Sequence, residues 1–76
     1  MKKVWYKEGT NIIHREDGPA LEFASGSKCW YKEDKLHRLD GPACEYANGT
    51  KYWYVEGIFY RNVNSVEELI IKMIIE

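Results

Sequence analysis

A repeat of 23 residues constrains the fold of this chain more than any other feature of its sequence. The motif His-Arg-Glu-Asp-Gly-Pro-Ala at positions 14–20 recurs as His-Arg-Leu-Asp-Gly-Pro-Ala at positions 37–43. The motif Trp-Tyr-Lys-Glu at positions 30–33 recurs as Trp-Tyr-Val-Glu at positions 53–56. Such a repeat builds a fold one unit at a time. We divide residues 1–76, taken as one domain, into repeat units at about 5–29, 30–52 and 53–63 and a helix at 65–76.

The composition allows one small globular domain. The 76 residues are 45% hydrophobic and 14% aromatic, which is typical of a folded chain. The formal net charge of −1 argues against binding nucleic acid through general electrostatics, because domains that do so are strongly basic. No apolar run is long enough to cross a membrane, and the first residues lack the apolar segment of a secretory signal. We therefore expect a cytoplasmic protein without a membrane or nucleic-acid partner.

Each repeat unit predicts a β-hairpin with a glycine at its tip. Short aromatic runs flank Gly26 in the first unit and Gly49 in the second. A two-residue loop would set Tyr46 against Lys51, whereas a three-residue loop with Gly49 in the left-handed region would set Glu45 against Lys51. We prefer the three-residue loop because it pairs opposite charges in both hairpins.

Alternation of side chains along these strands separates two faces of the predicted sheet. We expect the core on the face that carries Leu21, Phe23, Cys29, Tyr31, Cys44, Tyr46, Tyr52 and Tyr54. The opposite face carries Glu22, Lys28, Trp30, Lys32, Glu45, Lys51, Trp53 and Val55. A tight turn and a short strand follow each hairpin, with the short strands at residues 12–14, 35–37 and 58–60. The fold class is therefore mainly β: an antiparallel meander of roughly eight strands, capped by one C-terminal helix.

The last segment changes to a helical period. Ser65 and Glu68 form a capping box at the predicted start of the helix. An apolar stripe follows at Val66, Leu69, Ile70, Met73 and Ile74. One interpretation is a helix that caps the end of the sheet. The other is that Ile71 and Ile75, which lie outside the stripe, contact a second chain, and we expect a homodimer.

The period, the tip glycine, Tyr52-x-Tyr54 and the Glu56-Gly57 turn resemble MORN-type β-hairpin repeats. The His-Arg-x-Asp-Gly-Pro-Ala core resembles a variant found in uncharacterised phage and bacterial proteins, although ordinary MORN repeats have Gly-x-Gly in place of Asp-Gly-Pro-Ala. The resemblance implies a twisted sheet that serves as a scaffold or docking surface, and it implies no reaction. It also implies a phage origin, and from that context we expect an inhibitor of a host or antiviral-defence protein, acting in the host cytoplasm.

Four side chains could form a zinc site by residue type alone: His14, Cys29, His37 and Cys44. Their spacings match no zinc module, and His, Arg and Asp occur in both units, which indicates a structural role in each unit. We expect Arg15 and Arg38 to lie over tryptophans or to pair with Asp17 and Asp40. A single bridge between Cys29 and Cys44 is one possibility, but in a cytoplasmic chain we favour free thiols at both cysteines. We predict no metal, no cofactor and no catalysis.

Specific function is expected where the units differ. The candidate partner-binding residues are Asn11, Ile12, Ile13, Leu39, Phe59, Tyr60, Ile71 and Ile75. The favoured function is a non-catalytic protein–protein interaction module. The alternative is a small-ligand or nucleotide binder that uses the Trp/Tyr ladder at an interface between two chains.

Overall fold

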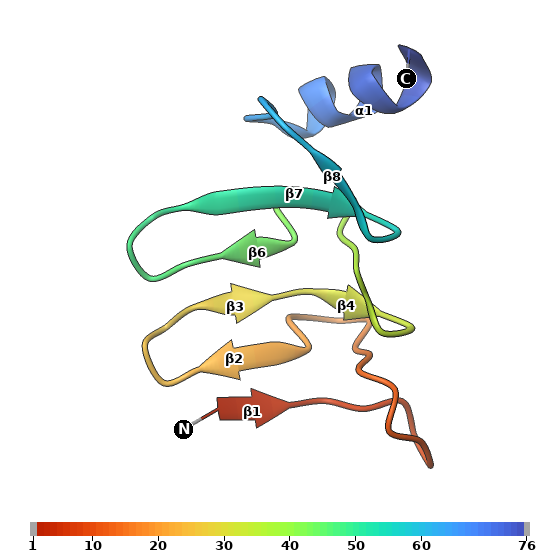
Figure 1. Ribbon diagram of the computed structural model, residues 1–76, viewed down its shortest axis with the longest axis vertical. Coiled ribbons are helices and arrows are strands. Elements are labelled where there is room, and N and C mark those ends of the chain that lie inside the picture. Colours follow the sequence, from red (N-terminus) through yellow and green to blue (C-terminus); the bar gives the residue numbers. More distant parts are fainter. Residues whose placement is uncertain (1, 76) are drawn as a thin grey trace.

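The computed structural model describes residues 2–75 and shows a mainly β fold (Figure 1). One antiparallel sheet has six strands in the order β1-β2-β3-β6-β7-β8, and β4 and β5 form a separate two-stranded ladder. The strands are β1 (Lys2–Val4), β2 (Leu21–Phe23), β3 (Lys28–Cys29), β4 (Tyr31–Lys32), β5 (Lys35–Leu36), β6 (Cys44–Glu45), β7 (Lys51–Val55) and β8 (Ile58–Tyr60), and the helix is α1 (Val66–Ile75). The thinnest dimension of the molecule is 17 Å, which leaves room for a single sheet layer with its side chains.

Both hairpins have the register that the three-residue loop predicts. Glu22 pairs with Lys28 across β2 and β3, and Glu45 pairs with Lys51 across β6 and β7. The two tip glycines have φ angles of 100° and 93°, in the region that glycine adopts without a steric penalty. The predicted turns and the register of both hairpins are therefore confirmed.

The strand through Trp30 changes its partner at that residue, so the chain is not one continuous meander. The Trp30 N–H donates to the Ala43 carbonyl at 2.7 Å. The Trp30 carbonyl accepts a hydrogen bond from the His37 N–H at 3.0 Å. As a consequence β3 pairs with β6, whereas β4 leaves the sheet and pairs with β5.

The short strand predicted over residues 12–14 is wrong, whereas the one predicted over residues 58–60 is confirmed as β8. In place of the first, a single β-bridge joins Tyr6 to Ile13. The first turn is two residues longer than the second, and local bonds fold its extra length. Both the N–H and the hydroxyl of Thr10 donate to the Lys7 carbonyl.

The largest buried cluster lies on the face opposite to the one predicted. It consists of Trp53, Val55, Val63 and Leu69, so the helix covers the tryptophan side of β7. On the predicted core face the two cysteines are buried, but Phe23, Tyr46 and Tyr52 are exposed. The prediction was wrong because the alternation of side chains defines two faces of the sheet but does not say which of them the helix covers.

Aromatic rings on the cysteine side pack against one another instead of against a second layer. The ring centres of Tyr46 and Tyr52 lie 5.7 Å apart in an edge-to-face arrangement. The Phe59 ring centre lies 5.9 Å from that of Tyr52 and 5.2 Å from that of Tyr54. Such pairs contribute roughly 0.5–1.5 kcal/mol beyond burial of area, which helps an open face to remain ordered.

The helix begins with the predicted cap in a modified form. The Ser65 hydroxyl accepts from the Glu68 N–H at 3.2 Å, as expected. The Glu68 carboxylate, however, reaches one residue further back and accepts from the Asn64 N–H at 2.9 Å. Glu76, the last residue of the predicted helix, lies outside the described residues. No helix within residues 2–75 is both long enough and apolar enough to cross a bilayer.

The predicted apolar stripe of the helix is only partly buried. Leu69 is fully buried, and Val66 and Met73 are partly buried against the same cluster. Ile70 and Ile74 are exposed, so their assignment to the buried stripe was wrong. A single hairpin is too narrow a support to cover more than one side of a helix that is apolar over most of its circumference.

We predict that replacing Gly49 with L-alanine lowers the free energy of unfolding by roughly 1 kcal/mol, because φ at this residue is positive. A Cβ at Gly49 would meet no atom within 4 Å, so the cost comes from the backbone alone. Chemical synthesis supplies a matched control, since D-alanine at position 49 favours positive φ and should retain the stability. Urea denaturation measures both variants. Equal stability of the L- and D-alanine proteins would contradict the left-handed turn.

Candidate functional site

Arg38 covers Trp30 and joins the loop of the repeated motif to the sheet. Its guanidinium carbon lies 3.7 Å from the centre of the Trp30 ring, which is cation–π geometry. The Nε atom donates to Asp40 at 3.0 Å, and Nη1 donates to the Pro42 carbonyl at 3.0 Å and to Glu45 at 2.9 Å. One side chain therefore covers an indole, neutralises two carboxylates and satisfies a backbone carbonyl.

Arg15 makes the corresponding set of contacts in the first unit. Its guanidinium carbon lies 4.1 Å from the Trp5 ring centre, and Nε donates to Asp17 at 3.1 Å. Nη1 donates to the Pro19 carbonyl at 3.1 Å, and its ion pair with Glu22 is longer, at 3.8 Å. We call the two sets the arginine clasps. They confirm the predicted placement of both arginines over tryptophans and beside aspartates.

The two histidines connect each turn to the next. The Nδ1 atom of His14 accepts from the Glu33 N–H at 3.1 Å, and that of His37 accepts from the Glu56 N–H at 3.0 Å. Each Nδ1 atom therefore carries its lone pair here, so that the proton of a neutral ring lies on Nε2. Within residues 2–75 no three His, Cys, Asp or Glu side chains converge in a way that could hold a metal ion.

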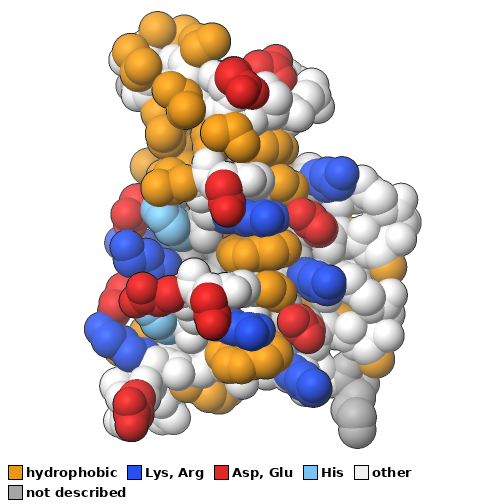
Figure 2. Space-filling model, turned by 180° about the vertical axis from the view of Figure 1, so that it is seen from behind, with side chains coloured by type: hydrophobic (Ala, Val, Ile, Leu, Met, Phe, Trp, Pro, Cys, Tyr) orange, Lys and Arg blue, Asp and Glu red, His pale blue; other side chains and the backbone are white. Residues whose placement is uncertain are grey.

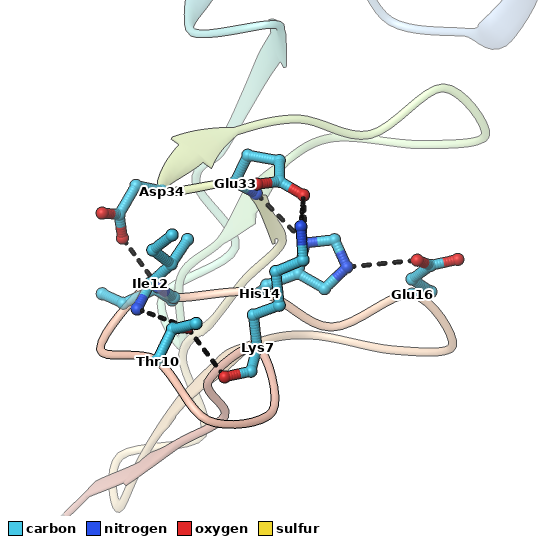
Figure 3. A network of polar contacts seen from close by, with 8 residues as sticks. Lys7, Thr10, Ile12, His14, Glu16, Glu33 and Asp34 are labelled. Carbon is cyan, nitrogen blue, oxygen red and sulfur yellow. Dashed lines mark hydrogen bonds and ion pairs between the residues drawn. The ribbon is translucent and has the colours of Figure 1, made fainter.

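The first turn is tied to the second by a polar network (Figure 3). Lys7 forms an ion pair with Glu33 at 2.7 Å and holds the pKa of that carboxyl below its usual range. The Ile13 N–H donates to the Asp34 carboxylate at 2.7 Å. Of the predicted partner-binding residues in this turn, Asn11 is exposed, whereas Ile12 and Ile13 are half-buried.

A groove of about 680 Å³ lies between the loops of the two clasps. It is lined by residues 15–18, 30–32 and 37–40. Leu39 stands at this groove and is 53% exposed. Carboxylates and cations alternate in the lining, and each guanidinium is already paired with an aspartate. The groove therefore lacks an electrostatic potential of one sign, which is what would attract a charged ligand.

The outer side of α1 is the most apolar exposed surface among the described residues. It consists of Ile70, Ile71, Ile74 and Ile75, which are 46%, 56%, 77% and 72% exposed, and we call it the isoleucine face. Figure 2 shows the hydrophobic side chains that gather at the α1 end of the molecule. At 100° per residue these four positions fall on one side of the helix, away from the side that carries Leu69.

The predicted partner-binding residues do not form one site. Ile71 and Ile75 share the isoleucine face, whereas Phe59 lies among the tyrosines of the cysteine side. Tyr60 is partly buried against the core cluster and supports it. The sequence interpretation missed Ile70 and Ile74 as surface residues. They could have been predicted from the narrow sheet on which the helix packs, since one hairpin cannot cover a stripe of five residues.

No protein-family model, curated protein or solved structure matches the chain, so its function has to be inferred from its own surfaces.

We predict that Gly41→Ala destabilises the protein more than Gly18→Ala, with a cost of about 1–3 kcal/mol at Gly41 from overpacking. A Cβ at Gly41 would lie 2.7 Å from the Arg38 guanidinium carbon, whereas one at Gly18 would lie 3.1 Å from that of Arg15. Urea denaturation followed by tryptophan fluorescence measures both variants. As a control, Gly41→Ala should cost little when Arg38 is already alanine. An equal cost with and without Arg38 would show that the glycine does not serve the clasp.

Proposed function

We propose that this chain is a non-catalytic protein-binding module that docks a partner protein through the isoleucine face of α1. The observation that carries the proposal is the exposure of four neighbouring isoleucines on a helix whose opposite side is already packed. Single exposed apolar residues are normal on protein surfaces, but contiguous apolar patches mark interaction sites.

The energetics favour a partner that covers this face. Full burial of one isoleucine side chain contributes roughly 1.5–3 kcal/mol, so covering the exposed parts of all four favours association. An apolar helix side that presents residues at i, i+1, i+4 and i+5 suits a hydrophobic groove or a second helix on the partner. Glu67 stands at the N-terminal border of the face, where it gives the apolar surface a polar rim.

We further propose that the sheet is a scaffold of MORN-like units that presents this helix. What supports the proposal is the recurrence of the clasp contacts 23 residues along the chain, from Arg15 to Arg38. Position 61, a further 23 residues along, is again arginine, but Trp53 is buried by Val63 and Leu69 in place of a clasp. The array of units would thus end at Trp53, because there the helix covers the tryptophan in place of a guanidinium. The outer side of the helix is then left for binding.

A second copy of the chain is the partner we propose first. A two-fold pair would bring two isoleucine faces together, and closed two-fold pairs are the commonest assembly of identical chains. The polar rim would then face solvent in both copies.

A second candidate function is binding of a small ligand, such as a nucleotide, in the groove between the clasps. The observation in its favour is the size of the groove and the presence of Trp30 and Tyr31 in its lining. We rank it second because both guanidinium groups of the groove are already paired with carboxylates. Calorimetric titration of the wild type with nucleotides would detect such binding without any protein partner.

We predict that the variant Ile71→Glu/Ile75→Glu loses protein binding and keeps its fold. Light scattering at tens of micromolar should give twice the monomer mass for the wild type and the monomer mass for this variant. Circular dichroism and urea denaturation should report an intact sheet, because neither side chain belongs to the buried cluster. Leu39→Glu is the control, since Leu39 is about as exposed as Ile71 but lies at the groove, and this variant should remain dimeric.

A monomeric wild type would exclude the second copy and leave a different protein as the partner. In that case a crosslinker placed at residue 74 should capture one defined protein with the wild type and with Leu39→Glu, and fail with the double variant. Capture that the double variant retains, or that Leu39→Glu abolishes, would contradict docking through the isoleucine face.

A further inference from the structure

Cys29 and Cys44 lie directly opposite each other on neighbouring strands. Cys29 ends β3 and Cys44 begins β6, and the two residues pair in the register of the sheet. Their sulfur atoms are 2.9 Å apart, with the Cys44 thiol donating to the Cys29 sulfur. Both side chains are free thiols and are almost fully buried, at 5% and 4% exposure. The sheet therefore brings together two thiols that are fifteen residues apart in the sequence.

The hydrogen-bond pattern of the ladder places this pair at a site that accommodates a disulfide. The neighbouring pair, Trp30 and Ala43, is hydrogen-bonded through the Trp30 N–H. Because bonded and non-bonded pairs alternate along antiparallel strands, Cys29 and Cys44 form a non-bonded pair, with Cα atoms about 4.5 Å apart. Disulfides span Cα separations of about 4.4–6.8 Å and need the sulfurs at about 2.05 Å, so the two sulfurs must close by about 0.9 Å.

The two thiols differ in acidity. The hydrogen bond from Cys44 lowers the pKa of the Cys29 thiol, against the opposing effect of burial. The same bond, together with burial, raises the pKa of the Cys44 thiol. Cys29 is therefore the sulfur that ionises first and attacks an electrophile, and Cys44 keeps its proton until the second step.

We propose that Cys29 and Cys44 are an oxidation site that forms a reversible intramolecular disulfide with a small peroxide. The Cys29 thiolate attacks one oxygen of hydrogen peroxide, the O–O bond breaks, and hydroxide leaves and takes up a proton. Cys29 is then a sulfenic acid. The Cys44 sulfur attacks the Cys29 sulfur, and the sulfenic hydroxyl leaves as water with the Cys44 proton. Two thiols and one peroxide thus give one disulfide and two waters, and a dithiol reductant reverses the reaction.

The bond would lock the junction between the two halves of the sheet. Strand β3 belongs to the half that contains β1 and β2, and β6 belongs to the half that contains β7 and β8. Two residue pairs join β3 to β6, and the hydrogen bond from the Trp30 N–H to the Ala43 carbonyl continues this junction. A peroxide would reach the buried sulfurs through local opening of the sheet, and a covalent bond would suppress that opening.

Oxidation of the folded protein with hydrogen peroxide, followed by intact mass spectrometry and thermal unfolding, tests the proposal. We expect the loss of two hydrogen atoms from the monomer, complete protection from alkylation, and a rise in Tm on the order of 10 °C for a closed loop of this length. Dithiothreitol should restore both the mass and the Tm. Gain of oxygen atoms on either cysteine, located by peptide mapping, disulfide-linked dimers or an unchanged Tm would overturn the proposal.

Two single-cysteine variants test the assigned roles. Cys44→Ala should stop at a sulfenic acid that a carbon nucleophile traps, and Cys29→Ala should form no intramolecular disulfide. Partial alkylation of the reduced wild type tests the order of the two steps, because the hydrogen bond between the sulfurs is intact there and Cys29 should be labelled first. Equal reactivity of the two sulfurs would overturn the order of the steps.

Discussion

The stacking of an arginine guanidinium on a tryptophan ring is the interaction on which this fold depends. A single-layer sheet has no second layer to cover its large side chains, and Arg15 and Arg38 supply that cover for Trp5 and Trp30. Each contact contributes on the order of 0.5–2 kcal/mol, and the same guanidinium also satisfies the carbonyl of the following proline. The residues of the repeated Arg-x-Asp-Gly-Pro motif thus act together to cover one tryptophan. The motif has glycine because a Cβ at this position would come too close to the guanidinium.

The isoleucine face arises where this repeated arrangement stops. At the third tryptophan the cover is apolar, from Val63 and Leu69, so the chain continues into α1 instead of another clasp. The helix uses Val66, Leu69 and Met73 for that purpose and leaves its isoleucines outside. A sheet held by polar clasps along most of its length thereby ends in an apolar helix, whose outer side is the surface that we propose for binding.

Local chemistry made part of this structure predictable. The tip glycines, the cross-strand charges and the arginines over tryptophans follow from residues close together within one unit. The core face could not be predicted in this way, because the alternation of side chains makes the two faces of the sheet equivalent. Only the position of the helix decides which face is covered. The pairing of Cys29 with Cys44 was not favoured from the sequence because it crosses from one unit to the next, and it depends on the change of partner at Trp30. The strand predicted at residues 12–14 was wrong because the first turn is two residues longer than the second, and local bonds fold this extra length.

Nuclear magnetic resonance of the arginine side chains tests the clasp most directly. Protons above an aromatic ring are shielded by it, so the δ-methylene protons and the Nε–H of Arg15 and Arg38 should resonate upfield of those of Arg61, which is the internal reference. The shift should be larger for Arg38, whose guanidinium lies 3.7 Å from its ring centre against 4.1 Å for Arg15. The Nε–H groups bonded to aspartates should also exchange slowly with solvent. Three arginines with the same unshifted, rapidly exchanging signals would contradict the account.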